Sequence, residues 1–431
     1  MRIGSTLALL GLVLTAAGCG GNEGGNDGAV AAGEPTARLE LNGQLFGFVW
    51  PPGGVGELEL AKLDPQTLAP RSQRLTLSAQ GAVTELSPDA NKLAIATHDP
   101  PSIAFVHLQS MRLLGDVDLG VPGYVSRLAW ARSGTLFAAV GQSTIALIDP
   151  EARQVLETRQ VDGSLLGDIQ PIAGGALALV APTEGIGPLK AVVFGEKGTS
   201  SQELGGIVGG STTKQGDDEA DFRATENIPA LAVDPDGQRA LVVPAGDEVA
   251  EIDLASMRVT FHSLSRPVSL LERLHNWLEP KAQAKLIEGP VRHAIWLRSG
   301  LVAVSGADHT ISNDQREVVM DPAGLSLIDT RSWSVRAINE GIDGVRLSAD
   351  YLVASEPWCA GSRQSYGLVA YGLNGNEFAR ICRDEGFDAQ LIGKYGFLGF
   401  DDNTKFEVVE LETGKTVARP RTAKTTSLIT N

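Results

Sequence analysis

Sequence motifs that would identify a catalytic site are missing from this chain. Only 3 of its 431 residues are cysteine and 6 are histidine. It contains no Gly-x-Ser-x-Gly, His-Glu-x-x-His or Cys-x-x-Cys motif, the patterns of nucleophile-elbow hydrolases, zinc proteases and dithiol redox proteins. The segment Gly209–Lys214 also lacks the Gly-Lys-Ser/Thr ending of a phosphate-binding loop. The sequence therefore predicts no catalytic residue and no cofactor.

Basic side chains are also scarce. The 36 lysine and arginine residues are outnumbered by 52 aspartate and glutamate residues, so the formal net charge is −16. A surface of this sign repels nucleic-acid phosphates and anionic lipid headgroups. We expect no nucleic-acid partner.

Apolar runs are short, and the most extended one lies at the N-terminus. Ile3–Ala17 is mostly apolar and follows the positive Arg2, and small residues precede Cys19. The run falls short of the ~20 residues that a membrane-spanning helix needs. This layout predicts a signal peptide over residues 1–18 and no transmembrane helix.

The end of this segment, Ala16-Ala17-Gly18-Cys19, resembles the lipobox of bacterial lipoproteins, in which the cysteine is acylated and becomes the first mature residue. The resemblance implies export and a lipid anchor on Cys19. The protein would then lie on the outer side of the cytoplasmic membrane or at the outer membrane, attached by the lipid alone. An ordinary secretory signal is the alternative. The Gly-rich residues 19–36 have almost nothing to bury and predict a flexible linker.

If Cys19 is lipidated, one pair of cysteines remains. Cys359 and Cys382 would then lie in a compartment that permits disulfides. We expect them to be bridged, and two buried free thiols are the alternative.

A repeat runs through the rest of the chain. Leu128–Gly134 matches Ala294–Gly300, and each is typical of an apolar strand, a polar turn and the start of another strand. A second feature, an apolar strand that ends in a polar turn, recurs along the sequence. Its markers are residues 64, 107, 149, 195, 253, 329, 372 and 410. The commonest step is about 43 residues, the length of one four-stranded propeller blade.

This pattern resembles the diverged surface-repeat propellers of the YVTN type and, more distantly, quinoprotein-like and WD40-like propellers. The resemblance implies an all-β propeller of seven to eight four-stranded blades over residues 37–421, followed by a tail over 422–431. Eight units can be counted, but one could be a non-blade element, and a solenoid of stacked sheets is the structural alternative. The turn Glu412–Lys415 resembles that of quinoproteins without their following tryptophan, which argues against a quinone.

Three insertions lengthen the repeat, at about 207–225, 265–290 and 307–322. In a propeller, connections between blades emerge on the same face as the loops between second and third strands. We therefore expect the insertions and the loop over 356–365 to crowd one face of units four to seven. Loops outside the scaffold carry function more often than the scaffold does.

The second insertion contains a predicted short amphipathic helix. Ser269–Glu272 has the spacing of a capping box, and apolar residues then repeat at helical intervals until Pro280. The apolar face of this helix either packs on the propeller or serves as a partner-binding or lid helix.

The candidate ligand-binding side chains lie in non-repeat chain. Asp308, His309, Asn313 and Asp314 fall close together on a predicted exposed loop. Their oxygen and imidazole groups could hold a divalent cation, but no second cluster fixes a geometry, so we assign no metal site. A solvated polar loop is the alternative reading. The acidic run over 217–221 is expected to face water.

The tryptophans divide into two kinds. Trp277, with His275 nearby, and Trp358 lie outside the repeat, where an aromatic side chain could anchor a ligand or a partner. Trp130 and Trp296 occupy equivalent strand positions, which predicts that they pack between blades.

These observations favour a non-catalytic binding or scaffold protein outside the cytoplasm that engages a protein or cell-envelope ligand through its insertions. The alternative is a propeller enzyme with its site at the mouth of the central channel, either a quinoprotein-like dehydrogenase or a lactonase-like hydrolase. That alternative depends on fold analogy alone.

Overall fold

The computed structural model describes residues 39–50, 58–77, 83–98, 100–215, 222–265, 287–311, 318–359, 366–400, 403–422 and 425–430. Within these ranges every element longer than a single turn is a β-strand, and no helix there is long and apolar enough to cross a membrane. The predicted signal peptide, Cys19, the predicted linker and the predicted helix of the second insertion lie outside the described residues.

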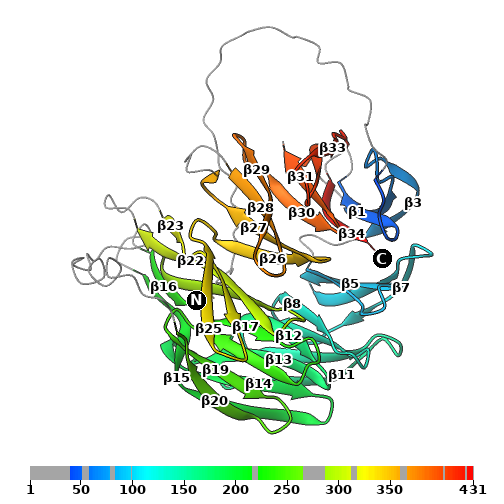
Figure 1. Cartoon of the computed structure of the whole chain (residues 1–431). Helices are drawn as coiled ribbons and strands as arrows, with labels where there is room; N and C mark the ends of the chain where they lie inside the picture. Colours follow the sequence, from blue (N-terminus) through cyan, green and yellow to red (C-terminus); the bar gives the residue numbers. More distant parts are fainter. Residues whose placement is uncertain are drawn as a thin grey trace.

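The fold is an eight-bladed β-propeller, which confirms the all-β prediction and its count of eight units (Figure 1). From the axis outwards, blade 1 contains β34 (Thr425–Thr430), β1 (Leu45–Val49), β2 (Leu58–Leu63) and β3 (Pro70–Leu77). Blade 2 contains β4 (Thr84–Leu86), β5 (Lys92–His98), β6 (Pro101–His107) and β7 (Arg112–Asp118). Blade 3 contains β8 (Val125–Trp130), β9 (Leu136–Val140), β10 (Thr144–Asp149) and β11 (Gln154–Gln160). Blade 4 contains β12 (Ser164–Ile172), β13 (Gly175–Ala181), β14 (Gly185–Gly195) and β15 (Gly198–Gln215).

The second half of the ring repeats this order and adds two strands. Blade 5 contains β17 (Ala230–Val233), β18 (Arg239–Val243), β19 (Glu248–Asp253) and β20 (Arg258–Ser263). Blade 6 contains β21 (Ile287–Trp296), β22 (Leu301–Ile311), β24 (Leu325–Asp329) and β25 (Ser334–Asn339). Blade 7 contains β26 (Gly344–Ser348), β27 (Tyr351–Glu356), β28 (Tyr366–Gly372) and β29 (Glu377–Arg383). Blade 8 contains β30 (Asp388–Ile392), β31 (Tyr395–Phe400), β32 (Lys405–Glu410) and β33 (Thr416–Ala418). The additional strands are β16 (Phe222–Asn227) and β23 (Val318–Pro322).

The C-terminal strand closes the ring. β34 pairs antiparallel with β1 through Phe46↔Ile429 and Phe48↔Thr426, so the first blade takes its innermost strand from the end of the chain (Figure 1). The predicted tail over 422–431 is therefore wrong, because Thr425–Thr430 belongs to the propeller. Pairing the two ends of the chain removes the open edge that β1 would otherwise expose.

Alternation of side chains explains how the blades pack. In β9, Leu136, Ala138 and Val140 contact blade 2, whereas Phe137 and Ala139 contact blade 4. Successive side chains of a strand point to opposite faces, so a strand between two blades is apolar on both. One hydrophobic cluster fills the interface between each pair of neighbouring blades.

The eight sequence markers fall at the ends of the third strands, from β2 to β32, within one residue. Asp149 shows why a polar residue recurs there, because its carboxylate accepts the backbone N–H groups of Glu151 and Ala152 at 2.8 and 2.9 Å. In blade 2, His107 takes this position and pairs through Nδ1 with the Ser110 hydroxyl at 2.9 Å. The repeated turn is thus held by the side chain that begins it.

Trp130 and Trp296 pack between blades, as predicted. They are 5% and 6% exposed. Trp130 donates its indole N–H to the carbonyl of Glu85 in blade 2 at 3.3 Å and meets the edge of Phe105. Trp296 lies under the Arg239 guanidinium of blade 5, 5.0 Å from the ring centre.

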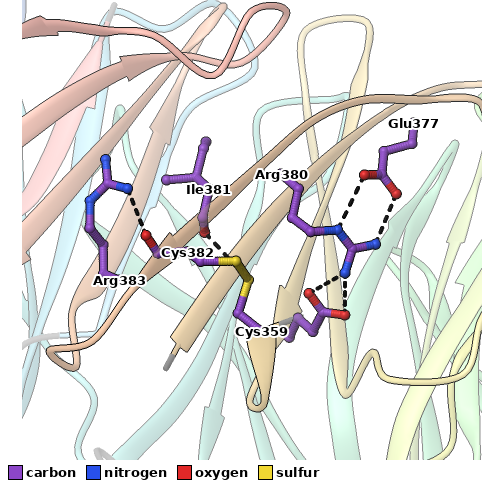
Figure 2. The surroundings of a disulfide bond; sticks show 7 residues. Cys359, Glu377, Arg380, Ile381, Cys382 and Arg383 are labelled. Carbon is purple, nitrogen blue, oxygen red and sulfur yellow. Dashed lines mark hydrogen bonds and ion pairs between the residues drawn. A yellow bond between two sulfur atoms is a disulfide. The ribbon is translucent and has the colours of Figure 1, made fainter. Parts of the chain in front are cut away.

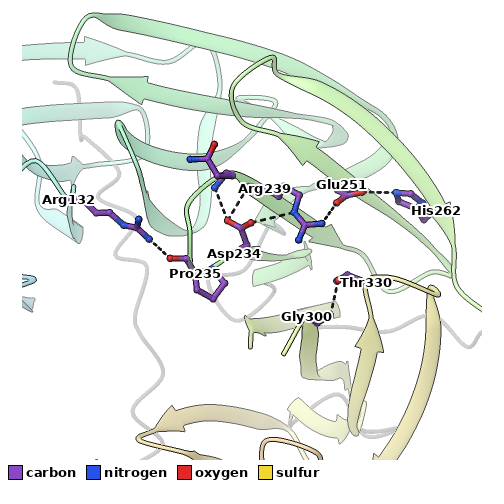
Figure 3. Close-up of polar contacts among 9 residues, drawn as sticks. Arg132, Asp234, Pro235, Arg239, Glu251, His262, Gly300 and Thr330 are labelled. Carbon is purple, nitrogen blue, oxygen red and sulfur yellow. Dashed lines mark hydrogen bonds and ion pairs between the residues drawn. The ribbon is translucent and has the colours of Figure 1, made fainter. Parts of the chain in front are cut away.

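A polar ladder reinforces the interface of blades 5 and 6 (Figure 3). Arg239 bridges Asp234 and Glu251, with nitrogen–oxygen distances of 3.4 and 3.0 Å. Glu251 pairs in turn with His262 at 3.0 Å, and the His262 ring stacks on Trp333 of blade 6. The turn that contains Asp234 thus has a structural role.

Candidate functional site

On one face of the propeller, blades 4 and 6 are joined across blade 5. This is the face that carries the turns between second and third strands and the connections between blades, and we call it the upper face. There β15 pairs with β16, β16 pairs in parallel with β21, β21 pairs with β22, and β22 pairs with β23. We call the joined upper segments the raised sheet. They are residues 185–188, 208–215, 222–227, 287–291, 306–311 and 318–322.

The parallel pairing of β16 with β21 holds the raised sheet together. β16 leads into β17, so the pairing joins the inner strands of blades 5 and 6. Ile228 donates its N–H to the Pro290 carbonyl and accepts the N–H of Arg292, both at 2.9 Å. Gly289 is required here, because its φ is +121° and a Cβ would lie 1.7 Å from the Glu226 carbonyl oxygen.

The raised sheet corrects one expectation and confirms another. Residues 207–225 and 307–322 were expected to be loops, and this is wrong for their described parts, which are strands. Each of these strands forms backbone hydrogen bonds with a strand of the neighbouring hairpin. The segments can therefore be extended strands although they have no separate hydrophobic core. The described parts of these two insertions lie on one face, as predicted, because the strand extensions share the upper face.

Asp308, proposed from the sequence as a ligand residue, forms an ion pair. It lies on β22, and one carboxylate oxygen is 2.7 Å from Nη2 of Arg292. The Arg292 side chain is 11% exposed, and its other terminal nitrogen donates to the carbonyl of Ala307 at 3.1 Å. This pair ties the base of the raised sheet to the inner strand of blade 6.

His309 lies one residue further along β22, opposite Gly289. Its Nδ1 atom is buried and has no hydrogen-bond partner within the described chain, and the same holds for the hydroxyl of Ser305 on the same face of β22. Among the described residues, no three His, Cys, Asp or Glu side chains are grouped so that they could hold a metal ion. An orphaned buried polar atom of this kind is a place where a water or ligand atom fits.

The remaining predicted site residues are not brought together by the described structure. Asn313, Asp314, His275 and Trp277 lie outside the described residues. Trp358 is half-buried in the turn after β27.

The predicted disulfide between Cys359 and Cys382 is present (Figure 2). It joins the connection after β27 to β29, the outer strand of blade 7. Beside it, Arg380 lies between Glu356 and Glu377, and its Nη2 is 2.9 Å from Glu377. Glu356 is only 6% exposed, so its carboxylate is buried, whereas the side chain of Arg380 is 30% exposed and reaches solvent.

Exposed apolar side chains lie at the blade 4 end of the raised sheet. Pro188 is directly opposite Val208, and Ile186 is opposite Gly210, so Ile186, Pro188 and Val208 share one face. Ile186 and Val208 are 39% and 41% exposed. Large apolar side chains that remain in water next to each other are typical of contact surfaces.

A second group of candidate residues lies on the inner strands, or directly before one in the case of Asp343, around the propeller axis. We call it the axial belt. Its members are Glu85, Arg127, Asp168, His293, Asp343 and Arg346. They come from blades 2, 3, 4, 6 and 7, and all but the half-buried Asp343 are exposed to solvent. Exposed side chains on innermost strands face the water-filled axis around which propeller blades are arranged.

Some charged side chains of the axial belt have no ion-pair partner within the described chain. Asp168 accepts a hydrogen bond from Nε of Arg127 at 2.7 Å. Arg346 donates to the carbonyl of Ala389 at 3.3 Å and has no carboxylate partner within the described chain. The side chains of Glu85 and His293 have neither a hydrogen-bond nor an ion-pair partner there.

Protein surrounds these groups on most sides, which shifts their pKa values. Burial and the negative charge of Asp168 raise the pKa of Glu85 to about 7. Burial lowers the pKa of His293, although Asp168 and Asp343 act in the opposite direction. Burial also raises the pKa of Asp343, and the hydroxyl of Ser355 partly offsets this by donating to it. Glu85 therefore changes protonation near neutral pH, whereas burial favours the neutral form of His293.

Sequence reasoning missed the axial belt. One signal was available: Arg127 and His293 each stand three residues before the matched tryptophans Trp130 and Trp296. The repeat predicts that Arg127 and His293 occupy equivalent positions on inner strands. It does not predict which charged side chains lie near them at the axis, because that depends on how the ring closes.

The architecture defines the class, an eight-bladed β-propeller of mainly four-stranded blades. No protein-family model and no curated protein matches the sequence. Among solved structures, the chain is similar to the dihydro-heme d1 dehydrogenase NirN in complex with DHE, with 13% identity, a TM-score of 0.56, and 92% of this chain and 77% of that one covered. It is also similar to BamB from Moraxella catarrhalis, with 10% identity, a TM-score of 0.47, and coverage of 80% and 89%. At these identities the likeness shows the fold alone.

Proposed function

We propose that this protein is an exported, lipid-anchored binding or scaffold protein without catalytic activity. It engages a protein or cell-envelope ligand through the raised sheet. The observation that carries the proposal is the joining of blades 4 and 6 across blade 5 by strands that the propeller itself does not need. The lipobox-like Cys19 and the Gly-rich linker after it support attachment at a membrane surface.

The raised sheet has the properties of a contact surface. Its strands are hydrogen-bonded to one another, so it loses little conformational freedom when a partner binds. The Arg292–Asp308 ion pair fixes its base. The exposed Ile186 and Val208 offer apolar area that a partner would remove from water.

The test is a double substitution, Ile186→Ser with Val208→Ser, in the full-length protein. The matched control is Leu113→Ser with Leu156→Ser, since these side chains are 43% and 51% exposed on the outer strands of blades 2 and 3. Immobilised proteins are incubated with envelope extract, and captured proteins are quantified by mass spectrometry. We expect the Ile186/Val208 variant to lose at least tenfold of a specifically captured partner while the control keeps it. Equal capture by wild type and both variants, all equally folded, would contradict the proposal.

The alternative is a propeller enzyme, quinoprotein-like or lactonase-like, with its site at the axis. The observation that favours it is the pair of unpaired titratable groups Glu85 and His293 on opposing blades. NirN bears the name of a dehydrogenase, and the propeller fold hosts both binding and catalysis. Elemental analysis and absorbance of the native protein separate the two. A bound metal, quinone or tetrapyrrole would favour the enzyme, and a clean apoprotein would favour the scaffold.

A further inference from the structure

A cavity lies at the upper end of the interface between blades 5 and 6, beside the base of the raised sheet. Apolar side chains form much of its wall, including Val243 of β18, Leu264 after β20 and Ile328 of β24. Ala245 and Ala323 also line it and are exposed, so the cavity is reached from the upper face.

The size of this cavity limits what it can hold. Its volume is about 80 Å³. One water needs about 10–15 Å³, and benzene fits an apolar cavity of about 150 Å³. The cavity therefore has room for an organic molecule smaller than benzene.

Among the described residues that line the cavity, Arg292 alone is charged. Its side chain is 11% exposed, and it lies on the same face of β21 as Trp296, which meets blade 5. Nη1 donates to the carbonyls of Val291 and Ala307 at 3.2 and 3.1 Å, and Nη2 is 2.7 Å from Asp308. A guanidinium has five N–H groups, so donors remain on Nε and Nη2.

The charge of Asp308 does not cancel that of Arg292 inside the cavity. Asp308 is not among the lining residues, and its side chain is 52% exposed, so water screens its charge. Arg292 is largely removed from water, where its charge acts more strongly. The cavity therefore favours a negative group next to Arg292.

Two serine side chains add hydrogen-bonding capacity to the wall. Ser326 lies on the same face of β24 as Ile328, and its hydroxyl has no hydrogen-bond partner within the described chain. Ser305 is 1% exposed, and its buried hydroxyl also has no partner in the described structure. A buried polar group without a partner marks a place where a ligand atom or a water fits.

From these contacts we infer that the cavity binds a short-chain carboxylate, a molecule with one carboxylate and a hydrocarbon part of about two or three carbons. The carboxylate accepts hydrogen bonds from the remaining donors of Arg292, a pairing that is strong because both groups are charged. The hydrocarbon part lies against the apolar wall. This site needs no protein partner, so it is independent of the binding function proposed for the raised sheet.

The experiment is a titration of the full-length protein with propanoate at pH 7, followed by saturation-transfer NMR of the ligand. Propanamide, which has the same shape without the charge, and propylammonium are titrated in parallel. We expect propanoate to bind with a Kd of roughly 1 mM or below, at least about tenfold more tightly than either other compound.

Three substitutions locate the binding. Arg292→Gln should weaken propanoate at least about tenfold. Ser326→Leu should do the same by filling the cavity, and it leaves the buried Arg292–Asp308 pair in place. Asp308→Asn should instead strengthen propanoate binding about threefold, because it removes a carboxylate that competes for Arg292. A merely structural role of Asp308 would not produce this gain.

The matched controls lie outside the cavity. Ser201→Leu changes an exposed serine of β15, and Arg71→Gln removes a charge on a side chain that is 50% exposed. Neither should change the propanoate affinity by more than about twofold. Equal binding of propanoate and propanamide would overturn the inference. So would absence of propanoate binding at about 10 mM, or unchanged propanoate affinity in a folded Ser326→Leu variant.

Discussion

Blades 3 and 6 share one design in their cores and differ above it. Each inner strand ends in a buried tryptophan that packs on the preceding blade. Blade 3 then stops at four short strands, whereas β21 and β22 of blade 6 run on into the raised sheet. The difference shows that the apolar repeat specifies the ring, while segments free of the repeat shape one face of it.

The largest effect should come from the tryptophans that the two blades share. Trp130→Ala and Trp296→Ala should each lower the free energy of unfolding by about 3–5 kcal/mol, because each leaves a cavity between blades. Urea denaturation measures this, with the exposed Leu156→Ala as control. A strong loss for one tryptophan and none for the other would contradict the equivalence of the two blades.

A smaller effect should distinguish the ion pairs of the two regions. Asp308→Asn should lower the free energy of unfolding by about 1 kcal/mol, because Arg292 is largely buried. Asp168→Asn breaks the more exposed pair with Arg127 and should cost about 0–0.5 kcal/mol. Both values come from urea titrations of the variants. The reverse order would mean that the Arg292–Asp308 pair does not support the raised sheet.

The smallest effect concerns pH. A carboxyl group whose pKa is higher in the folded state than in the unfolded state adds stability at low pH, and that stability is lost as the pH rises through the folded value. Glu85 should therefore make the protein less stable as the pH rises from about 4.5 to about 7, and only slightly, because its side chain is exposed and water screens its charge. Comparing unfolding of the wild type and Glu85→Gln across this range measures the contribution. An identical pH dependence in both proteins would contradict the raised pKa.

The regular part of this fold could be predicted closely from the sequence. The sequence markers coincided with the ends of the third strands. The turn at each of these ends needs a polar side chain such as Asp149, and a polar residue after an apolar strand can be recognised in the local sequence. The interblade tryptophans were predictable for a similar reason, since Leu128–Trp130 and Ala294–Trp296 match. Cys359 and Cys382 could be paired by elimination once Cys19 was assigned to the lipid.

The rest could not be predicted, because it depends on pairing between distant segments. The strand character of Asp308 and His309 arises from partners on β21 and β23, and local composition does not specify them. The last six described residues looked like a tail because their partner, β1, is almost the whole chain away. Glu85 and His293 became site candidates only once the ring placed their blades opposite each other.

The parallel pairing of β16 with β21 holds the raised sheet together, and hydrogen exchange of individual amides can measure its stability. The amides of Ile228 and Arg292 each donate across this junction at 2.9 Å. We expect both amides to exchange as slowly as the amides of β9 in the regular core, and Gly289→Ala to accelerate the exchange of both. Rapid exchange of these two amides in the wild-type protein would contradict this expectation.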